Sequence, residues 1–422
     1  MTTNTLKHFK PERKEETRLS VIVFSIFLLG FLLRPSIFQG YGEVIFAAFV
    51  GSIGFYALIG LKGYVSTRRV AFVISVILFS GYITIQAAVM GVGEIGPLLK
   101  NIAFILLPSF AVFLLSSQTW PSALKVIVYT VGLFIPSYLV STILLLLGYE
   151  LNQVSYFQFV VPMGEKEYEM FLTLPFSVYI SSLAELGPVE LPRAVGIFRE
   201  PGLFQILTVM TFFGVDFVNV RFKQLLRWGS LFVLLLTFST AGWGVFIICW
   251  AYYYLIAKRG GHGLSIKRFG AQIGTTMVLV GLVYFFLFAE SKASLLTKLQ
   301  SGSGQVRILA LLQSIEIFAS NPIFGVGYGN SDVDTVLFIG TMAQIGTVGL
   351  VLVLAMIFGP NLDLVLRRHP VVVLMIPVLV TSLLSQPIFD KSIFVLIVGM
   401  VTAYPYRQVE YDRFWSQARN HT

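Results

Sequence analysis

The chain has 422 residues, of which 56% are hydrophobic and only 12% are charged. A soluble globular protein carries about twice that charged fraction, so the composition excludes a soluble domain and indicates a membrane protein. The formal net charge of +9 does not indicate a nucleic-acid partner, because the basic residues cluster between apolar segments, where they orient a membrane protein.

Apolar runs recur along the whole chain. We predict an all-α polytopic membrane protein with about twelve transmembrane helices, because these runs have roughly the length that a bilayer requires. Ten-residue segments of alternating hydrophobicity are not found, which argues against an outer-membrane barrel. The predicted spans are Leu19–Leu33, Val44–Leu61, Val70–Met90, Leu98–Leu115, Leu124–Leu147, Leu203–Val220, Arg227–Phe238, Ala241–Ala257, Phe269–Phe288, Thr335–Phe358, Pro370–Leu384 and Ser392–Tyr404.

The spans form one predicted domain over residues 19–405, between tails at 1–18 and 406–422. The first apolar run follows a charged tail and lacks a small-residue cleavage site, so we expect a retained span. With the N-terminus in the cytoplasm, most of the 30 Lys and Arg residues fall on the cytoplasmic side, which is the expected bias. Both termini are then cytoplasmic, and two long loops, at about 148–202 and 289–334, face outward.

Cysteine and histidine usage limits the chemistry of the outer face. The one cysteine, Cys249, lies in an apolar span, so no disulfide within the chain is expected. The histidines are His8, His262, His369 and His421, and all fall in cytoplasmic segments. We therefore expect no outer zinc site built on His or Cys, and no metal or cofactor.

The first long loop ends in a candidate anion site. Arg193 and Arg199 are separated by Gly196, and Glu200 and Pro201 follow. Arginine suits phosphate oxygens because its planar fork donates paired hydrogen bonds at fixed charge. Pro201 suits the first turn of a helix, and a helix start offers free N–H groups to an anion. A salt bridge from Arg199 to Glu185 or Glu190 is the alternative, and Glu200 is either a general base or a neutralising partner.

The second long loop carries Arg307 on a helix-length segment, Val306–Ala319, that is too short to span and lies against the bundle or in the membrane interface. A glycine-dense turn follows, with Gly325, Gly327 and Asn330 as candidate substrate-binding residues. Glycines let backbone approach a ligand closely. The alternative is an ordinary tight turn into the next span.

Further polar residues are candidates of lower weight. Asp332 and Asp334 precede the tenth span and either act on substrate or complement the helix dipole. Lys100 adds positive charge to the site or snorkels to the interface. Asp216 is expected to pair with Arg221 or to snorkel. Inter-helix hydrogen bonds are expected from Gln86, Asn101, Gln344 and Gln386.

Five pieces of sequence, taken in chain order, resemble the O-antigen ligase and polymerase superfamily of bacterial inner-membrane proteins. They are Arg193…Gly196-Ile-Phe-Arg-Glu200-Pro201, Leu236-Thr-Phe-Ser239-Thr240, Gly302-Ser-Gly…Arg307, Asn321-Pro-Ile-Phe-Gly325-Val-Gly327-Tyr-Gly329-Asn330 and Ala343-Gln-Ile-Gly346-Thr-Val-Gly349. The N-terminal half matches only in hydropathy. The resemblance implies a GT-C-like fold, an inner-membrane location and two periplasmic loops.

The resemblance also implies an activity. Such enzymes transfer a glycan from undecaprenyl diphosphate to a lipid-linked acceptor without metal or nucleotide sugar, and a chain-length regulator is a further partner. Ligases of the family typically carry a His before the glycines of the tenth span, where this chain has Asp334-Thr335. We therefore expect a Wzy-type polymerase with Arg193, Arg199, Glu200 and Arg307 as catalytic residues. An O-antigen ligase and a twelve-span transporter or flippase are the alternatives.

Overall fold

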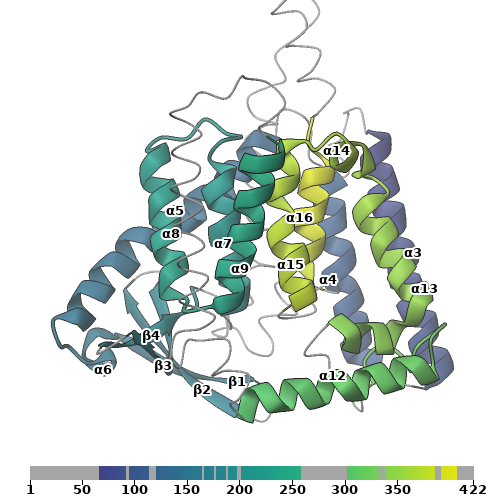
Figure 1. Cartoon of the computed structure of the whole chain (residues 1–422), viewed down its shortest axis with the longest axis horizontal. Helices are drawn as coiled ribbons and strands as arrows, with labels where there is room; N and C mark the ends of the chain where they lie inside the picture. The colour runs from purple at the N-terminus through teal and green to yellow at the C-terminus, as the bar shows by residue number, and fades with distance from the viewer. Residues whose placement is uncertain are drawn as a thin grey trace, which may run out of the picture.

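A helical bundle carries a small sheet and one transverse helix at the same end (Figure 1). The computed structural model describes residues 66–91, 95–113, 120–163, 166–174, 177–186, 189–196, 201–257, 302–330, 333, 338–384 and 391–405. Three of the predicted spans, Leu19–Leu33, Val44–Leu61 and Phe269–Phe288, lie outside these residues.

Except for the short helix Leu362–Leu366, which lies between the tenth and eleventh predicted spans, the bundle helices overlap the predicted apolar runs. They are α3 (Thr67–Met90), α4 (Ile95–Phe113), α5 (Trp120–Leu146), α7 (Pro201–Gly214), α8 (Lys223–Leu236), α9 (Thr240–Trp250) with the π-helix η2 (Ala251–Ala257), α13 (Phe338–Phe358), α14 (Leu362–Leu366), the 3₁₀-helix η4 (Pro370–Leu374), α15 (Ile376–Leu384) and α16 (Ser392–Thr402). The two helices outside the bundle are α6 (Leu151–Val154) and α12 (Gly302–Ser320).

Three of these helices, α3, α5 and α13, are long and apolar enough to cross a membrane. The described residues therefore show a mostly helical protein with three helices of spanning length, rather than twelve demonstrated spans. Some predicted spans are shorter as helices for local reasons. For example, α7 ends at Gly214, before the predicted end at Val220, and Asp216 beyond it pairs with residues of α8.

The prediction of an all-α protein is wrong for the first long loop, which folds as a four-stranded antiparallel sheet in the order β1-β2-β3-β4. The strands are β1 (Phe157–Met163), β2 (Lys166–Leu174), β3 (Ser177–Leu186) and β4 (Val189–Ala194). Aromatic and β-branched residues favour these strands. β2 and β3 have nine and ten residues, but each contains consecutive apolar residues, such as Met170-Phe171-Leu172, so they lack the strict alternation of a barrel strand.

Hydroxyl groups join the sheet to α5. Ser137 of α5 donates to Ser177 of β3 at 2.9 Å, and the hydroxyls of Ser141 and Thr173 lie 2.7 Å apart. The Tyr138 hydroxyl donates to the carbonyl of Val178 at 2.7 Å. These groups are buried, so each bond replaces one that water would otherwise provide. The sheet is therefore fixed on the end of α5.

The centre of the bundle is formed by mainly apolar helices that are buried on every side. All residues of α16 are buried, and α7 is buried from Phe204 to its end at Gly214. A helix that is hydrophobic all round belongs in a core. By contrast, α3 exposes large apolar side chains, including Ile74, Ile77 and Ile85, on its outer side. The candidate segment that ends at Glu200 therefore continues directly into a central helix.

Candidate functional site at one end of the bundle

Arg193 lies on β4, where that strand meets the end of α8. Its side chain is half-buried, and its Nε donates to the carbonyl of Thr237 at 3.3 Å. Thr237 follows the last residue of α8, so its carbonyl belongs to the negative end of that helix. A cation at a helix C-terminus is favourable, because the carbonyls there lack intrahelical partners. Arg193 thus holds the sheet against the junction between α8 and α9.

The predicted division between the seventh and eighth spans is confirmed. α8 ends at Leu236 and α9 begins at Thr240, with Ser239 between them as the N-cap residue. The Ser239 hydroxyl accepts a hydrogen bond from the Gly242 amide at 3.2 Å, which satisfies one of the free N–H groups of the first turn. Phe238 adopts a positive φ of 47°, which turns the chain between the two helices.

Gly196 fixes the segment that follows Arg193. Its φ is +64°, and a β-carbon there would lie 2.8 Å from the ring of Phe204 on α7. Its amide donates to the Tyr138 hydroxyl at 2.7 Å. The same hydroxyl also contacts Val178 of β3, so one tyrosine of α5 ties the candidate segment to the sheet. Only glycine suits this position, because it needs both a positive φ and the space of a missing side chain.

Arg199 and Glu200 lie outside the described residues. Pro201 is the first residue of α7, so the prediction that it occupies the first turn of a helix is confirmed. A proline is tolerated there because its missing N–H would have had no helical partner.

The predicted helix over Val306–Ala319 is confirmed as α12. Figure 1 shows α12 running across the end of the bundle that also carries the sheet. Arg307 lies in the second turn of α12, and its side chain is not described. Buried Ala310 and Ser314 mark the side of α12 that faces the protein, while Leu309 and Leu312 are exposed. The two candidate arginine segments therefore share one end of the bundle.

The glycine turn is inserted into a break in α13. At Gly346 the backbone is non-helical, with φ 64° and ψ −172°. The turn satisfies the backbone groups that the break leaves without helical partners. The amides of Val326 and Gly327 donate to the carbonyls of Ala343 and Gln344 at 3.0 and 3.1 Å. The amides of Thr347 and Val348 donate to the carbonyls of Pro322 and Ile323 at 2.8 and 3.1 Å. Buried backbone groups need such partners, so the turn and the break require each other.

This arrangement limits how the turn can bind a ligand. The amide of Gly325 donates to Asn321 and that of Gly327 to Gln344, so neither N–H is available to an anion. Asn330 is half-buried, and its side-chain amide donates to Val326 at 3.3 Å. The role of these residues in substrate binding stays a prediction. Asp332 and Asp334 lie outside the described residues, and Lys100 lies on α4 without a described side chain.

Two residues of α3 hold the same turn. The prediction that Gln86 joins helices is confirmed, because its Nε2 donates to the Gln344 carbonyl of α13 at 2.7 Å. Gln344 instead joins its helix to the turn, since its Nε2 donates to the Asn330 carbonyl at 3.1 Å. Sequence reasoning missed Tyr82, whose hydroxyl donates to Ile345 at 2.6 Å. A tyrosine in an apolar span gives no sequence signal for such a contact.

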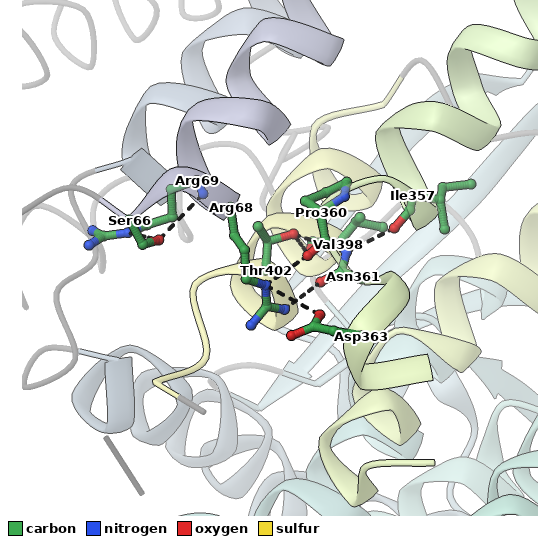
Figure 2. A network of polar contacts seen from close by, with 9 residues as sticks. All are labelled: Ser66, Arg68, Arg69, Ile357, Pro360, Asn361, Asp363, Val398 and Thr402. Atoms are coloured by element: carbon green, nitrogen blue, oxygen red, sulfur yellow. Dashed lines mark hydrogen bonds and ion pairs between the residues drawn. The ribbon is translucent and has the colours of Figure 1, made fainter. Parts of the chain in front are cut away.

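The opposite end of the bundle carries a different polar network. Figure 2 shows Arg68, at the start of α3, donating to the carbonyl of Pro360 at 2.7 Å and to Asn361 Oδ1 at 3.2 Å. Asn361 Nδ2 donates to Thr402 of α16 at 3.0 Å. Arg68 also lies 3.7 Å from the half-exposed carboxylate of Asp363. These contacts tie the beginning of α3 to the ends of α13 and α16.

The prediction that Asp216 pairs with Arg221 is wrong. Its carboxylate lies 2.5 Å from Arg227 and 2.8 Å from Lys223, both on α8, and accepts a hydrogen bond from Tyr253 at 3.0 Å. One turn of helix separates Lys223 from Arg227, so both reach the same carboxylate. Burial alone would raise the pKa of Asp216, but the bonds from Lys223, Arg227 and Tyr253 outweigh it and hold the pKa below its ordinary value.

Comparison with protein-family models, curated proteins and solved structures finds no match for this chain.

Proposed function

We propose that the protein is a Wzy-type polysaccharide polymerase, which transfers a glycan from undecaprenyl diphosphate to a lipid-linked repeat unit at the outer face of a bacterial inner membrane. The observation that carries the proposal is the common location of the two arginine-bearing segments. The sheet with Arg193 and the helix with Arg307 occupy one end of the bundle (Figure 1).

The charge pattern supports an outward direction for that end. The opposite end holds Arg68, Lys223 and Arg227, which belong to segments that the positive-inside bias assigns to the cytoplasm. Contacts between distant segments, such as Arg68 with Asn361 and Arg193 with Thr237, join residues that the predicted topology assigns to the same side. The helix directions are therefore compatible with the topology that the reaction needs.

The reaction needs little beyond positioning and positive charge. The acceptor hydroxyl attacks the anomeric carbon of the donor glycan, a new glycosidic C–O bond forms, and the bond to the diphosphate oxygen breaks. Undecaprenyl diphosphate leaves with the bonding electron pair, and Arg193, Arg199 and Arg307 stabilise its negative charge. The hydroxyl proton passes to a carboxylate, for which Glu200, Asp332 and Asp334 are the candidates.

The deciding experiment uses the purified protein with undecaprenyl-diphosphate repeat units as the only substrate. A polymerase produces a ladder of longer lipid-linked glycans, and EDTA leaves the rate unchanged. A ligase makes no ladder and requires a second acceptor lipid. A transporter makes no covalent product. If a product forms only after lipid A core is added, a ligase replaces the proposal, and the lack of any product from a verified substrate would refute it.

A further inference from the structure

The backbone break in α13 exposes carbonyls that the inserted turn satisfies only in part. The carbonyls of Gln344 and Ile345 beside the break, together with that of Phe324 in the turn, accept side-chain hydrogen bonds from α3. Two residues of α3, one turn of helix apart, supply these bonds. The joint therefore has three parts: the turn, the broken helix and the end of α3.

Gln86 uses both ends of its amide group in this joint. Its Nε2 donates to the carbonyls of Phe324 and Gln344, the latter at 2.7 Å. Its Oε1 accepts from the amide of Tyr328 at 3.3 Å. The side chain is buried, so water cannot replace these bonds if the amide is removed. Gln86 thus connects the turn, α13 and α3 at a single point.

Tyr82 lies one turn earlier on the same side of α3. Its hydroxyl donates to the carbonyl of Ile345 at 2.6 Å and lies 3.2 Å from the carbonyl of Phe324. Its ring packs at Gly349, where a β-carbon would lie 2.9 Å from it. Tyr82 and Gln86 therefore both contact Phe324 in the turn and the carbonyls that precede Gly346.

The joint also lies directly beside the end of α12. α12 ends at Ser320, and the turn begins with the next residue, Asn321, whose carbonyl accepts from the Gly325 amide at 3.0 Å. A rigid helix follows the position of the end that is anchored. Because Arg307 lies about three and a half turns before that end, a change in the joint would move Arg307 with the helix.

We propose that Gln86 and Tyr82 are positioning residues that fix α12 relative to α3 and α13, and with it Arg307. The effect on catalysis rests on the proposed function, whereas the position of α12 does not. The two parts can be measured separately.

The structural measurement is a distance between spin labels on α12 and α3. The native Cys249 is buried, so cysteines introduced at the exposed positions Leu309 and Ile77 can be labelled selectively. We expect one narrow distance distribution in the parent protein, and a broad or shifted one after Gln86→Leu. Gln158→Leu is the matched control, because Gln158 is an exposed glutamine on β1. Tyr82→Phe removes only a hydroxyl and tests the same joint if Gln86→Leu fails to fold.

The enzymatic measurement is ladder synthesis by the same variants. We expect at least a ten-fold loss of kcat in Gln86→Leu at normal protein abundance, and an unchanged rate in Gln158→Leu. Unchanged distances in both Gln86→Leu and Tyr82→Phe would overturn the positioning role. Changed distances with full polymerisation would overturn its link to catalysis. Changed distances in a protein that never polymerises would support the joint and refute only the proposed function.

Discussion

Gly325→Ala tests whether the turn and the broken helix need each other. The φ of Gly325 is +71°, and a β-carbon there would lie 2.6 Å from the carbonyl oxygen of Ala343 and still closer to that of Gln344. Both contacts are with backbone, which cannot rotate away as a side chain would. The alanine therefore forces the turn to move off α13.

The expected cost has two parts. A non-glycine residue in the left-handed region costs about 1–2 kcal/mol. Moving the turn also breaks the bonds from Val326 to Ala343 and from Gly327 to Gln344, each of which contributes about 1 kcal/mol. The sum is about 3–4 kcal/mol. Gly329→Ala is the matched control, because Gly329 has a φ of +83° but open space around its β-carbon position. It should cost about 1–2 kcal/mol.

The assay is reversible unfolding in mixed micelles, with the free energy of unfolding compared among the parent protein and the two variants. The difference between Gly325→Ala and Gly329→Ala isolates the backbone contact from the conformational strain, since both glycines have a positive φ. Equal stability of the two variants would refute the reasoning, because it would mean that the turn does not rest on α13 as described.

Further predictions address charge, function and orientation. Asp216→Asn should lower the free energy of unfolding by about 3 kcal/mol, because it leaves the largely buried Arg227, which is 14% exposed, without its charged partner. Asp363→Asn should lower it by less than about 1 kcal/mol, because Asp363 is half-exposed. Because the folded pKa of Asp216 is lowered, its contribution to the free energy of unfolding is full at neutral pH. It should begin to decline as the pH falls below about 4, and it should be lost as the pH falls through the folded pKa. Arg193→Ala should abolish the glycan ladder, and Arg193→Lys should restore little of it, because a lysine lacks the paired donors of arginine. Arg221→Ala, at the opposite end of the bundle, should leave the ladder intact. A full ladder from the Arg193→Ala protein would contradict the role proposed for Arg193. Cysteines at Glu167 and Lys298 should react with an impermeant thiol reagent in intact cells whose outer membrane is permeabilised, and one at Gly261 only after lysis; labelling of Gly261 in intact cells would reverse the orientation.

The helices were predictable because their signal is strong and local. A run such as Val70–Met90 has the length and hydropathy of a span, and α3 occupies Thr67–Met90. The break at Ser239 was predictable as well, since an apolar stretch too long for one helix met a residue that caps helices well. Hydropathy and capping depend on neighbours in sequence, so sequence reasoning can evaluate them.

The sheet and the polar partners were harder to predict because they depend on contacts between distant residues. β2 and β3 include parts of the apolar segment Met170–Leu183, whose composition fits a strand or a short helix equally well. The partner of Asp216 was misassigned because three nearby cations were candidates, and only the fold brings Arg227 and Lys223 to it. Likewise, the alternation of Gly325 and Gly327 is visible in the sequence, but its partner, the break at Gly346, lies about two helix turns into α13, and nothing in the sequence links the two.

Both long loops reach the bundle at an interruption of a helix. Arg193, from the first loop, donates to Thr237 where α8 stops, and the turn of the second loop fills the break of α13 at Gly346. In an apolar bundle, such interruptions are where backbone carbonyls lack helical partners and where polar groups can be bound without cost to the rest of the helix. A polar loop can therefore pack against this bundle at few places, and the two long loops do so at the end of α8 and at the break in α13. The same requirement anchors two segments that carry arginines, Arg193 on β4 and Arg307 on α12, at one end of the bundle, which is the placement that the proposed lipid-diphosphate site requires.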